Sequence, residues 1–441
     1  MTAAGGTIAA CATPAGRGAL AVVRLSGPHT AAVRDAVLRP CRVGDWAHGR
    51  ARRVDLVDRD GTFDDGMAVF AAAPRTYTGE DSLEITLHGN PLLVERLLAA
   101  CLAAGARLAG PGEFTRRAAV NGKLDLVAAE GVDQLIRAST PAGVQIARQA
   151  VSGRLSDVLL GFRATVVGVL AELEARLDYP ADELAFHGDD ALLATLAELG
   201  DRCSALADTH EAGRRLVEGA RVALVGPVNA GKSSLFNALL RSERALVHER
   251  AGTTRDVVEA RTRLGPLDVT LLDTAGERET DDPIEAAGLA LAQQLVAGAD
   301  LLLVVLGSAG GDPTERAILA RTAPLPRIVV SNQIDRLPPA PDTIAVSART
   351  GAGLESLERA IVTALLGGLP EGPAIASLRQ ADLLRSLARA SEEAAGALPF
   401  AGVAVAAEIL VEALGELDAL TGADTREDVL DAVFARFCIG K

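Results

Sequence analysis

Eight residues from Gly226 to Ser233 form a phosphate-binding motif. Their sequence, GPVNAGKS, satisfies the pattern GxxxxGK[ST], follows the apolar stretch Val222 to Val225 and precedes a helical pattern. In this motif backbone N–H groups surround the phosphates, the lysine reaches the outer phosphates, and the hydroxyl group ligates Mg²⁺. We therefore predict nucleotide contacts from the loop and the first helical turn, namely Asn229, Ala230, Gly231, Lys232, Ser233 and Ser234.

Four further motifs follow in the order expected of a guanine-nucleotide site. Thr253 and Thr254 lie where a switch loop would offer a hydroxyl to Mg²⁺ and the γ-phosphate, and we predict that Ser233 and Thr254 hold the metal. Asp335 would accept two hydrogen bonds from guanine N1–H and the 2-amino group, which adenine cannot supply. The predicted ligand is therefore GTP. The remaining predicted contacts come from the motifs DTAG, NQID and SAR, namely Asp273, Thr274, Ala275, Gly276, Asn332, Asp335, Ser347, Ala348 and Arg349.

Two positions depart from the usual pattern. Gln333 stands where NKxD has a lysine that packs over the base and the phosphate loop, so we expect weaker affinity with retained specificity. Glu277 follows the DxxG motif, where Ras-like enzymes place a water-orienting glutamine. The γ-phosphate would repel a carboxylate, which makes Glu277 a poor candidate for that role.

Three kinds of pattern along the chain predict its domains. Residues 217–370 alternate short apolar stretches with helical segments, which indicates a parallel sheet flanked by helices. Residues 121–216 and 371–441 have helical periodicity, and residues 1–120 mix short strands with Gly- and Pro-rich turns. The predicted fold class is α/β plus all-α, in which a nucleotide-binding domain interrupts a helical domain behind an N-terminal α/β domain.

Apolar spacing supports the helical prediction on both sides of the insert. Steps of three or four residues place one group of side chains on a single helix face: Leu159, Phe162, Val166, Leu170, Leu173 and Leu177. Helical steps return near the C-terminus at Val405, Ile409, Ala413, Leu417 and Leu420.

Composition excludes several classes of protein. The net charge of −14 argues against a general nucleic-acid coat, because phosphate neutralisation needs clustered cations. Five scattered cysteines without CxxC spacing favour a reducing compartment. No signal-peptide pattern or run of about 18 apolar residues occurs, so we expect a cytoplasmic protein.

Lysine is rare in this chain. The 44 basic residues include only Lys123, Lys232 and Lys441. A compositional bias towards arginine should spare a lysine where the wide guanidinium cannot replace the compact ammonium. Lys232 lies in the phosphate loop, and this logic marks the other two lysines as candidate site residues.

The chain also resembles the bacterial MnmE (TrmE) family of tRNA modification GTPases along nearly its whole length. The resemblance lies in motifs that include RLSG at 24–27, YTGED at 77–81, PGEFT at 111–115, NGKLDL at 121–126, DYP at 178–180 and FCIGK at 437–441. It implies a Ras-like P-loop G domain inserted in the helical domain. It also implies homodimers and an MnmG-like FAD-dependent partner.

The implied function is 5-carboxymethylaminomethyl-type modification of the wobble uridine, position 34, of certain tRNAs. GTP hydrolysis would drive conformational change, and a tetrahydrofolate such as 5-formyltetrahydrofolate would supply one carbon. The implied folate contacts are Arg24, Glu84, Lys123 and Lys441. Arginine and lysine suit the folate carboxylates, whereas Glu84 suits the amino donors of the pterin. A surface ion pair is the alternative role for Arg24 and Glu84.

The resemblance further implies a K⁺ ion that offsets charge during hydrolysis, held by Asn229, His248, Arg250 and Thr253. Asn229 could instead simply form a turn. Glu285 would orient the attacking water through a second water, with an exposed helix position as its alternative. Cys438 could act as a nucleophile or acid/base, or it could be a small apolar filler.

Two other functions remain open at this point. A ribosome-assembly GTPase switch would share the GTP motifs but usually adds a KH-like GxxG module or a second GTPase domain. A folate-dependent aminomethyl carrier would share only the N-terminal fold.

Overall fold

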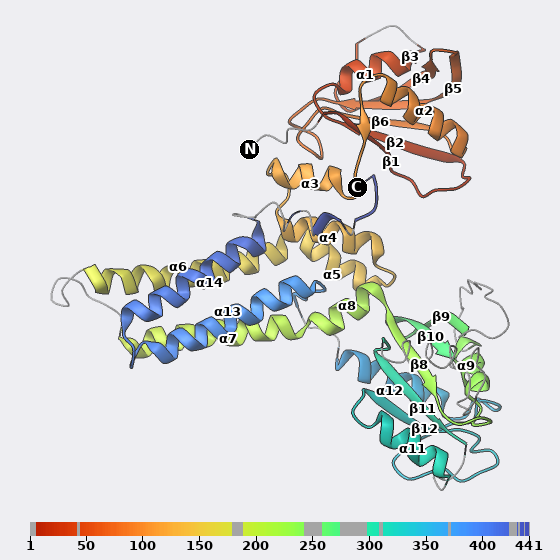
Figure 1. Ribbon diagram of the computed structural model, residues 1–441, viewed down its shortest axis with the longest axis vertical. Helices are drawn as coiled ribbons and strands as arrows, with labels where there is room; N and C mark the ends of the chain where they lie inside the picture. The colour runs from red at the N-terminus through yellow and green to blue at the C-terminus, as the bar shows by residue number, and fades with distance from the viewer. Residues whose placement is uncertain are drawn as a thin grey trace, which may run out of the picture. The chain divides into compact units, whose positions relative to one another are not determined.

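The computed structural model shows two sheets and a set of long helices (Figure 1). It describes residues 6–41, 45–178, 188–241, 258–273, 298–307, 312–368, 372–422, 430, 433–435 and 437–440. Two compact units emerge, the first made of Met1–Asp133, Ala150–Leu192 and Glu393–Lys441, and the second of Gln134–Gln149 and Leu193–Glu392.

The N-terminal part of the first unit is a seven-stranded sheet in the order β3-β4-β5-β6-β2-β1-β7. All neighbours are antiparallel except β1 and β7. Alternating burial along β2 and β6 produces one apolar face, which α1 and α2 cover. The elements are β1 Ile8–Cys11, β2 Leu20–Ser26, α1 Thr30–Val37, β3 Leu38–Pro40, β4 Arg50–Asp58, β5 Gly61–Ala71, β6 Ser82–His88, α2 Pro91–Ala103, β7 Arg107–Leu108 and α3 Glu113–Val120.

Helices from before and after the second sheet pack together within each unit. In the first unit α6 lies along α14, and Arg163 Nε donates to Asp418 Oδ1 at 2.7 Å (Figure 1). In the second unit Gly200 of α7 faces Ala388 of α13. The nucleotide-binding segment is therefore an insertion into a helical region. The helices are α4 Leu126–Arg137, α5 Pro141–Val151, α6 Arg154–Asp178, α7 Asp189–Asp208, α8 His210–Glu218, α13 Leu378–Ala397 and α14 Val403–Thr421.

The inserted sheet has six strands in the order β13-β12-β11-β8-β10-β9. Only β9 is antiparallel to its neighbour, so the carboxyl ends of the other five strands meet at one edge. Continuous burial of β11 is typical of a parallel strand that is covered on both faces. The elements are β8 Ala220–Val225, α9 Lys232–Arg241, β9 Val258–Leu264, β10 Leu267–Asp273, β11 Leu301–Leu306, α11 Pro313–Thr322, β12 Arg327–Ser331, β13 Ile344–Ala345 and α12 Leu354–Leu366.

These elements confirm the predicted fold class, an N-terminal α/β part and helices interrupted by a P-loop domain. The apolar face of α6 is confirmed, because five of its predicted members are buried: Leu159, Phe162, Val166, Leu170 and Leu173. Leu177 is 53% exposed because it lies in the last turn of that helix, so its predicted burial was wrong. The domain boundaries at residues 120, 216 and 370 stay a prediction. Among the described helices, none is both long and apolar enough to cross a membrane.

Asp300, at the start of β11, joins α8 to the inserted sheet. Its Oδ1 accepts from Arg214 and from Arg215 Nε at 3.3 Å, and its Oδ2 accepts from the Arg221 N–H at 2.8 Å. Burial opposes ionisation of this carboxyl, but the three donors outweigh it and lower the pKa of Asp300. The ionised carboxylate therefore stabilises the second unit.

Asp300→Asn is expected to lower the free energy of unfolding at pH 7 by roughly 2–4 kcal/mol, because it removes the partly buried carboxylate that Arg214, Arg215 and the Arg221 N–H share. Since the folded pKa is depressed, this stabilisation is fully present above the unfolded pKa of about 3.9 and is lost as pH falls from there through the lower folded pKa. Calorimetric unfolding at pH 7 and at about pH 2.5 should show the difference between the proteins shrink in acid. Asp268→Asn, which breaks a surface pair with Arg263, is the matched control and should cost about 1 kcal/mol or less.

Candidate functional site

The phosphate loop lies between β8 and α9, at the edge where the parallel strands end. Lys232 is 7% exposed, and its Nζ donates to the carbonyls of Gly226 and Pro227, both at 2.9 Å. Gly231 has φ of 86°, and a Cβ there would lie 2.4 Å from Asn332 Nδ2. Glycine is therefore required at position 231. The loop holds the Lys232 ammonium group next to the backbone N–H groups that bind phosphates.

Asn332 connects the phosphate loop to the loop after β13. Its Nδ2 donates to the carbonyls of Ala230 and Gly231 at 3.1 and 3.3 Å, and its Oδ1 accepts from the Ala348 N–H at 3.1 Å. The side chain is buried with 4% exposure. Asn332 thus connects the phosphate loop to the SAR motif, about a hundred residues away in sequence.

Asp335 and Ser347 lie side by side at the base-binding end. Ser347 Oγ donates to Asp335 Oδ1 at 2.7 Å, and Arg349 pairs with Asp335 Oδ2 at 2.8 Å. The hydrogen bond from Ser347 lowers the pKa of Asp335, outweighing burial, and the Arg349 and Arg336 charges add to it. Asp335 is therefore an ionised acceptor, as recognition of guanine N1–H and the 2-amino group requires.

Asp335 and Arg349 line a cavity of about 810 Å³, together with Asn332 and Gly231. That volume suits a nucleotide-sized ligand. Asn237 and Ala238 also line it, and the sequence analysis left them out, although they follow Ser234 by three and four residues on the same helix face. The full lining is Gly231, Ser234, Asn237, Ala238, Asn332, Gln333, Asp335, Arg336, Ala348, Arg349, Thr350, Gly351 and Leu354.

Gln333 adopts a left-handed conformation with φ of 65°, and its Nε2 donates to the Asn229 carbonyl at 2.9 Å. It therefore keeps one contact with the phosphate loop that a lysine at this position would make. Asn229 itself has φ of 69°, which asparagine tolerates better than most residues. Asn229 therefore forms a turn, as its alternative role predicted. Its role as a K⁺ ligand stays a prediction.

Asp273 ends β10 beside the phosphate loop. Burial raises the pKa of its carboxyl, while the Ser233 hydroxyl and the Lys232 charge lower it in part. Among the residues that the structure describes, none hydrogen-bonds to the buried Asp273 Oδ1. A hydroxyl and an unsatisfied carboxylate oxygen side by side are the hard ligands that Mg²⁺ prefers, directly or through its waters. The residues present fit that metal.

Part of the predicted site lies outside the described residues. This group holds the switch residues, most K⁺ ligands, the candidate water-orienting residue and the last lysine: His248, Arg250, Thr253, Thr254, Thr274, Ala275, Gly276, Glu277, Glu285 and Lys441.

In the N-terminal sheet, Arg24 and Glu84 face each other across β2 and β6. Arg24 Nη2 lies 2.7 Å from Glu84 Oε1, and its Nη1 donates to the Gly440 carbonyl at 3.4 Å. The ion pair predicted as the alternative is thus present. It is partly exposed, at 23% and 47%, so both groups remain reachable by a ligand.

The C-terminal segment lies against the N-terminal sheet. Ile439 bridges to Pro111, the Gly112 N–H donates to the Cys438 carbonyl at 3.3 Å, and Gly440 packs on Cys11. Cys438 is an exposed free thiol, so the filler role is wrong for this arrangement. Lys123 is also exposed and lies beside Gly79. Sequence spacing had no means to place Gly440 against Arg24, 416 positions away.

Comparisons with known proteins cover the whole chain. A family model described as the MnmE helical domain matches residues 126–438, and one described as the GTP-binding protein TrmE N-terminus matches residues 7–123. The tRNA modification GTPase MnmE of Roseiflexus castenholzii (strain DSM 13941 / HLO8) is 39% identical over 468 residues, with 99% of each chain covered. The tRNA modification GTPase MnmE of Chloroflexus aurantiacus (strain ATCC 29366 / DSM 635 / J-10-fl) is 40% identical over 455 residues, again with 99% of each chain covered. The similarity therefore extends well beyond the nucleotide site.

Proposed function

This chain belongs to the family of the tRNA modification GTPase MnmE, and we propose that it modifies the wobble uridine, position 34, of certain tRNAs in a 5-carboxymethylaminomethyl-type reaction. The chain is a GTP hydrolase that acts in tRNA modification. The observation that carries the proposal is the joint presence of the guanine-binding edge around Asp335 and of a partly exposed Arg24–Glu84 pair that contacts the C-terminal segment at Gly440.

The nucleotide site binds and orients GTP with groups that are already in place. Asp335 selects the base, and Asn332, which accepts from the Ala348 N–H, connects the base-binding loop to the phosphate loop. Lys232 exchanges its two carbonyl acceptors for the outer phosphate oxygens when GTP binds. Ser233 and Thr254 would hold Mg²⁺, with Asp273 beside Ser233, and the ion would neutralise charge on the phosphates. GTP hydrolysis drives conformational change rather than the uridine chemistry.

A potassium ion is proposed to offset the charge that spreads over the transition state, with Asn229, His248, Arg250 and Thr253 as its ligands. We expect GTP hydrolysis to be faster in K⁺ than in Na⁺ at equal ionic strength, because a cavity shaped for the larger ion holds the smaller one poorly. Steady-state phosphate release in the two salts measures this. Equal rates would contradict the cation proposal.

Glu285 is proposed to orient the attacking water through a second water. Glu285→Ala is expected to slow turnover by about 10²-fold, in the range of positioned general acid–base groups, while GTP affinity changes little. Single-turnover hydrolysis and nucleotide binding measured on the same preparation separate the two quantities. A large loss of affinity would instead assign Glu285 a structural role.

A tetrahydrofolate, such as 5-formyltetrahydrofolate, is the proposed one-carbon donor. Arg24, Lys123 and Lys441 would contact its carboxylates, and Glu84 would accept from the amino groups of the pterin. The exposure of the Arg24–Glu84 pair and of the Cys438 thiol supports this assignment. Cys438 is the proposed nucleophile or acid/base of the site.

The proposed assembly is a cytoplasmic homodimer joined through its N-terminal domains, with an MnmG-like FAD-dependent protein as partner and tRNA as substrate. The net charge of −14 supports a partner that supplies part of the tRNA-binding surface, because 58 acidic residues outnumber 44 basic ones in this chain.

Mass spectrometry of tRNA nucleosides from a deletion strain tests the proposal. Loss of the wobble-uridine modification, restored by the wild-type gene but not by a Cys438→Ser variant that still hydrolyses GTP, would support it. An unchanged nucleoside profile combined with a ribosome-assembly defect would overturn it in favour of a ribosome-assembly switch.

A further inference from the structure

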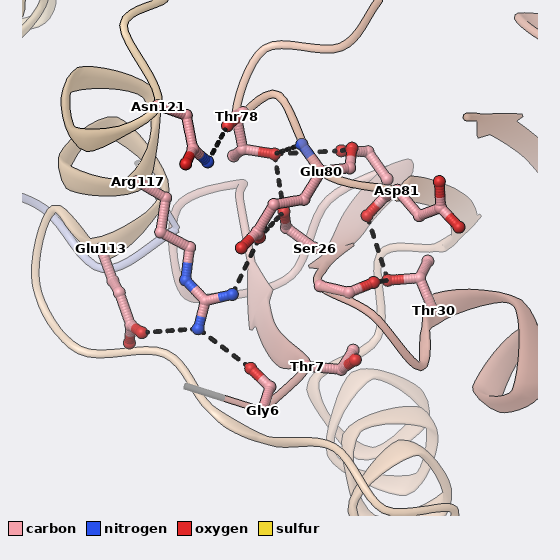
Figure 2. A network of polar contacts seen from close by, with 12 residues as sticks. Gly6, Thr7, Ser26, Thr30, Thr78, Glu80, Asp81, Glu113, Arg117 and Asn121 are labelled. Atoms are coloured by element: carbon pink, nitrogen blue, oxygen red, sulfur yellow. Dashed lines mark hydrogen bonds and ion pairs between the residues drawn. The ribbon is translucent and has the colours of Figure 1, made fainter. Parts of the chain in front are cut away.

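Arg117, on α3, is the centre of a buried polar network in the N-terminal sheet domain (Figure 2). Its side chain is 3% exposed. Nη1 donates to Glu80 Oε2 at 2.8 Å, and Nη2 donates to the Gly6 carbonyl at 2.9 Å and to Glu113 Oε1 at 3.0 Å. One guanidinium therefore joins three separate segments of the chain.

The network holds the loop from Thr76 to Asp81 by hydrogen bonds to Thr78 and Glu80. Ser26 Oγ donates to Glu80 Oε2 at 2.8 Å and lies 2.7 Å from Thr78 Oγ1. Asn121 Nδ2 donates to the Thr78 carbonyl at 2.7 Å, and Figure 2 shows Arg117 and Asn121 approaching the loop from the same helical side. Thr78 and Ser26 are buried, so these bonds are shielded from water.

The alternate residues of the same loop point outward. Tyr77 is 41% exposed, and its hydroxyl lies 3.0 Å from Thr115 Oγ1. Thr115 follows Phe114, whose ring centroid lies 5.8 Å from Arg24 Cζ, so the Tyr77 hydroxyl contacts the same turn of α3 that packs on Arg24. Gly79 has φ of 78°, and a Cβ there would lie 3.3 Å from Lys123 Cε. The loop thus lies between two of the residues assigned to the folate, Arg24 and Lys123.

We propose that Arg117 is a positioning residue for the folate site, because it holds the Thr76–Asp81 loop so that Tyr77 and Gly79 set the places of Arg24 and Lys123. The inference rests on the proposed folate function. Arg117 itself is too deeply buried to touch a ligand, and it acts through Glu80 and Thr78. Lysine can replace it only in part, because a single ammonium cannot bridge Glu80, Glu113 and the Gly6 carbonyl in one plane.

Calorimetric titration of the full-length chain with 5-formyltetrahydrofolate tests this inference. Arg117→Gln is expected to weaken binding by about tenfold or more, in line with the effect of a small misplacement of binding groups. Arg117→Lys should recover part of the affinity. Glu80→Gln should weaken binding similarly, and the double variant should be no worse than either single one, because both act through the same contact. GTP hydrolysis, which belongs to the second unit, should not change in any of them.

Two matched controls separate positioning from loss of stability. Leu97→Ala opens a cavity in the buried core of the same sheet without touching the loop, and Arg107→Gln removes the other cation on Glu113. Both should bind folate within about twofold of the wild type, even where Leu97→Ala lowers the melting temperature as much as Arg117→Gln does.

Wild-type affinity in Arg117→Gln would overturn the inference and leave the folate proposal intact. Equal weakening in Leu97→Ala at a matched melting temperature would overturn it as well. Absence of folate binding by the wild-type chain would refute the proposed folate function itself, and the inference with it.

Discussion

Lys232→Arg is expected to abolish GTP hydrolysis as thoroughly as Lys232→Met does, with turnover reduced by about a thousandfold in both. The ammonium is enclosed by the loop, with carbonyl acceptors at 2.9 Å on two sides and 7% exposure. A planar guanidinium is too wide for this space, although it carries the same charge. Loss of one preorganised donor to a developing negative charge costs about 10²–10³ in turnover, and displacement of the loop adds to it.

Single-turnover hydrolysis at saturating GTP measures the effect of Lys232→Arg. Lys123→Arg is the matched control, because it is the same substitution at an exposed lysine of the first unit, and GTP hydrolysis there should equal that of the wild type. Turnover of Lys232→Arg near the wild-type rate would show that charge alone suffices, and that the rarity of lysine in this chain has no bearing on the site.

Asp335→Asn is expected to weaken GTP binding by about a hundredfold or more and to transfer the preference to xanthosine triphosphate. A site built around a hydrogen-bonding group discriminates strongly against a ligand that cannot complete the bonds. The Asp335 carboxylate only accepts, whereas an asparagine amide also presents a donor. That donor opposes the 2-amino group of guanine but matches the carbonyl that xanthine has at the same position.

Competition binding with GTP, xanthosine triphosphate and ATP measures the switch in specificity. Asp342→Asn makes the same chemical change at an exposed position of the loop between β12 and β13, outside the cavity, where φ of 56° suits asparagine. That control should keep wild-type GTP affinity. Weakened GTP binding in Asp335→Asn without any gain for xanthosine triphosphate would mean that Asp335 supports the loop, through Ser347, rather than reading the base.

Much of the nucleotide site was predictable because its motifs are local. Each of these motifs follows a strand, and parallel strands end at one edge of a sheet, so the order of motifs along the chain was enough to bring Asp335, Ser347 and Lys232 to that edge. The motifs did not show which side chain connects the phosphate loop to the base-binding loop. Asn332 was predicted as a contact with the nucleotide, yet the structure shows its amide joining the phosphate loop to Ala348.

The helices were predictable in the same way, from their apolar periodicity. The periodicity did not always show which residues of a helix are buried. The apolar steps predicted a helix near the C-terminus, and α14 confirms it. Val405 is nevertheless 41% exposed, whereas its neighbour Ala406 is fully buried. An alanine next to a valine gives no local signal of which one faces a partner helix, because close helix packing favours the smaller side chain.

The sequence by itself determined the phosphate loop, the choice of guanine and the three parts of the chain, because these depend on residue type and short spacing. Only the tertiary structure decided that Gly440 meets Arg24, that helices flanking the insert pack together, and that Arg117 supports the Thr76–Asp81 loop. Such contacts join segments far apart in the chain, and their formation depends on how whole sheets and helices pack. Spacing along the sequence carries no record of those distances.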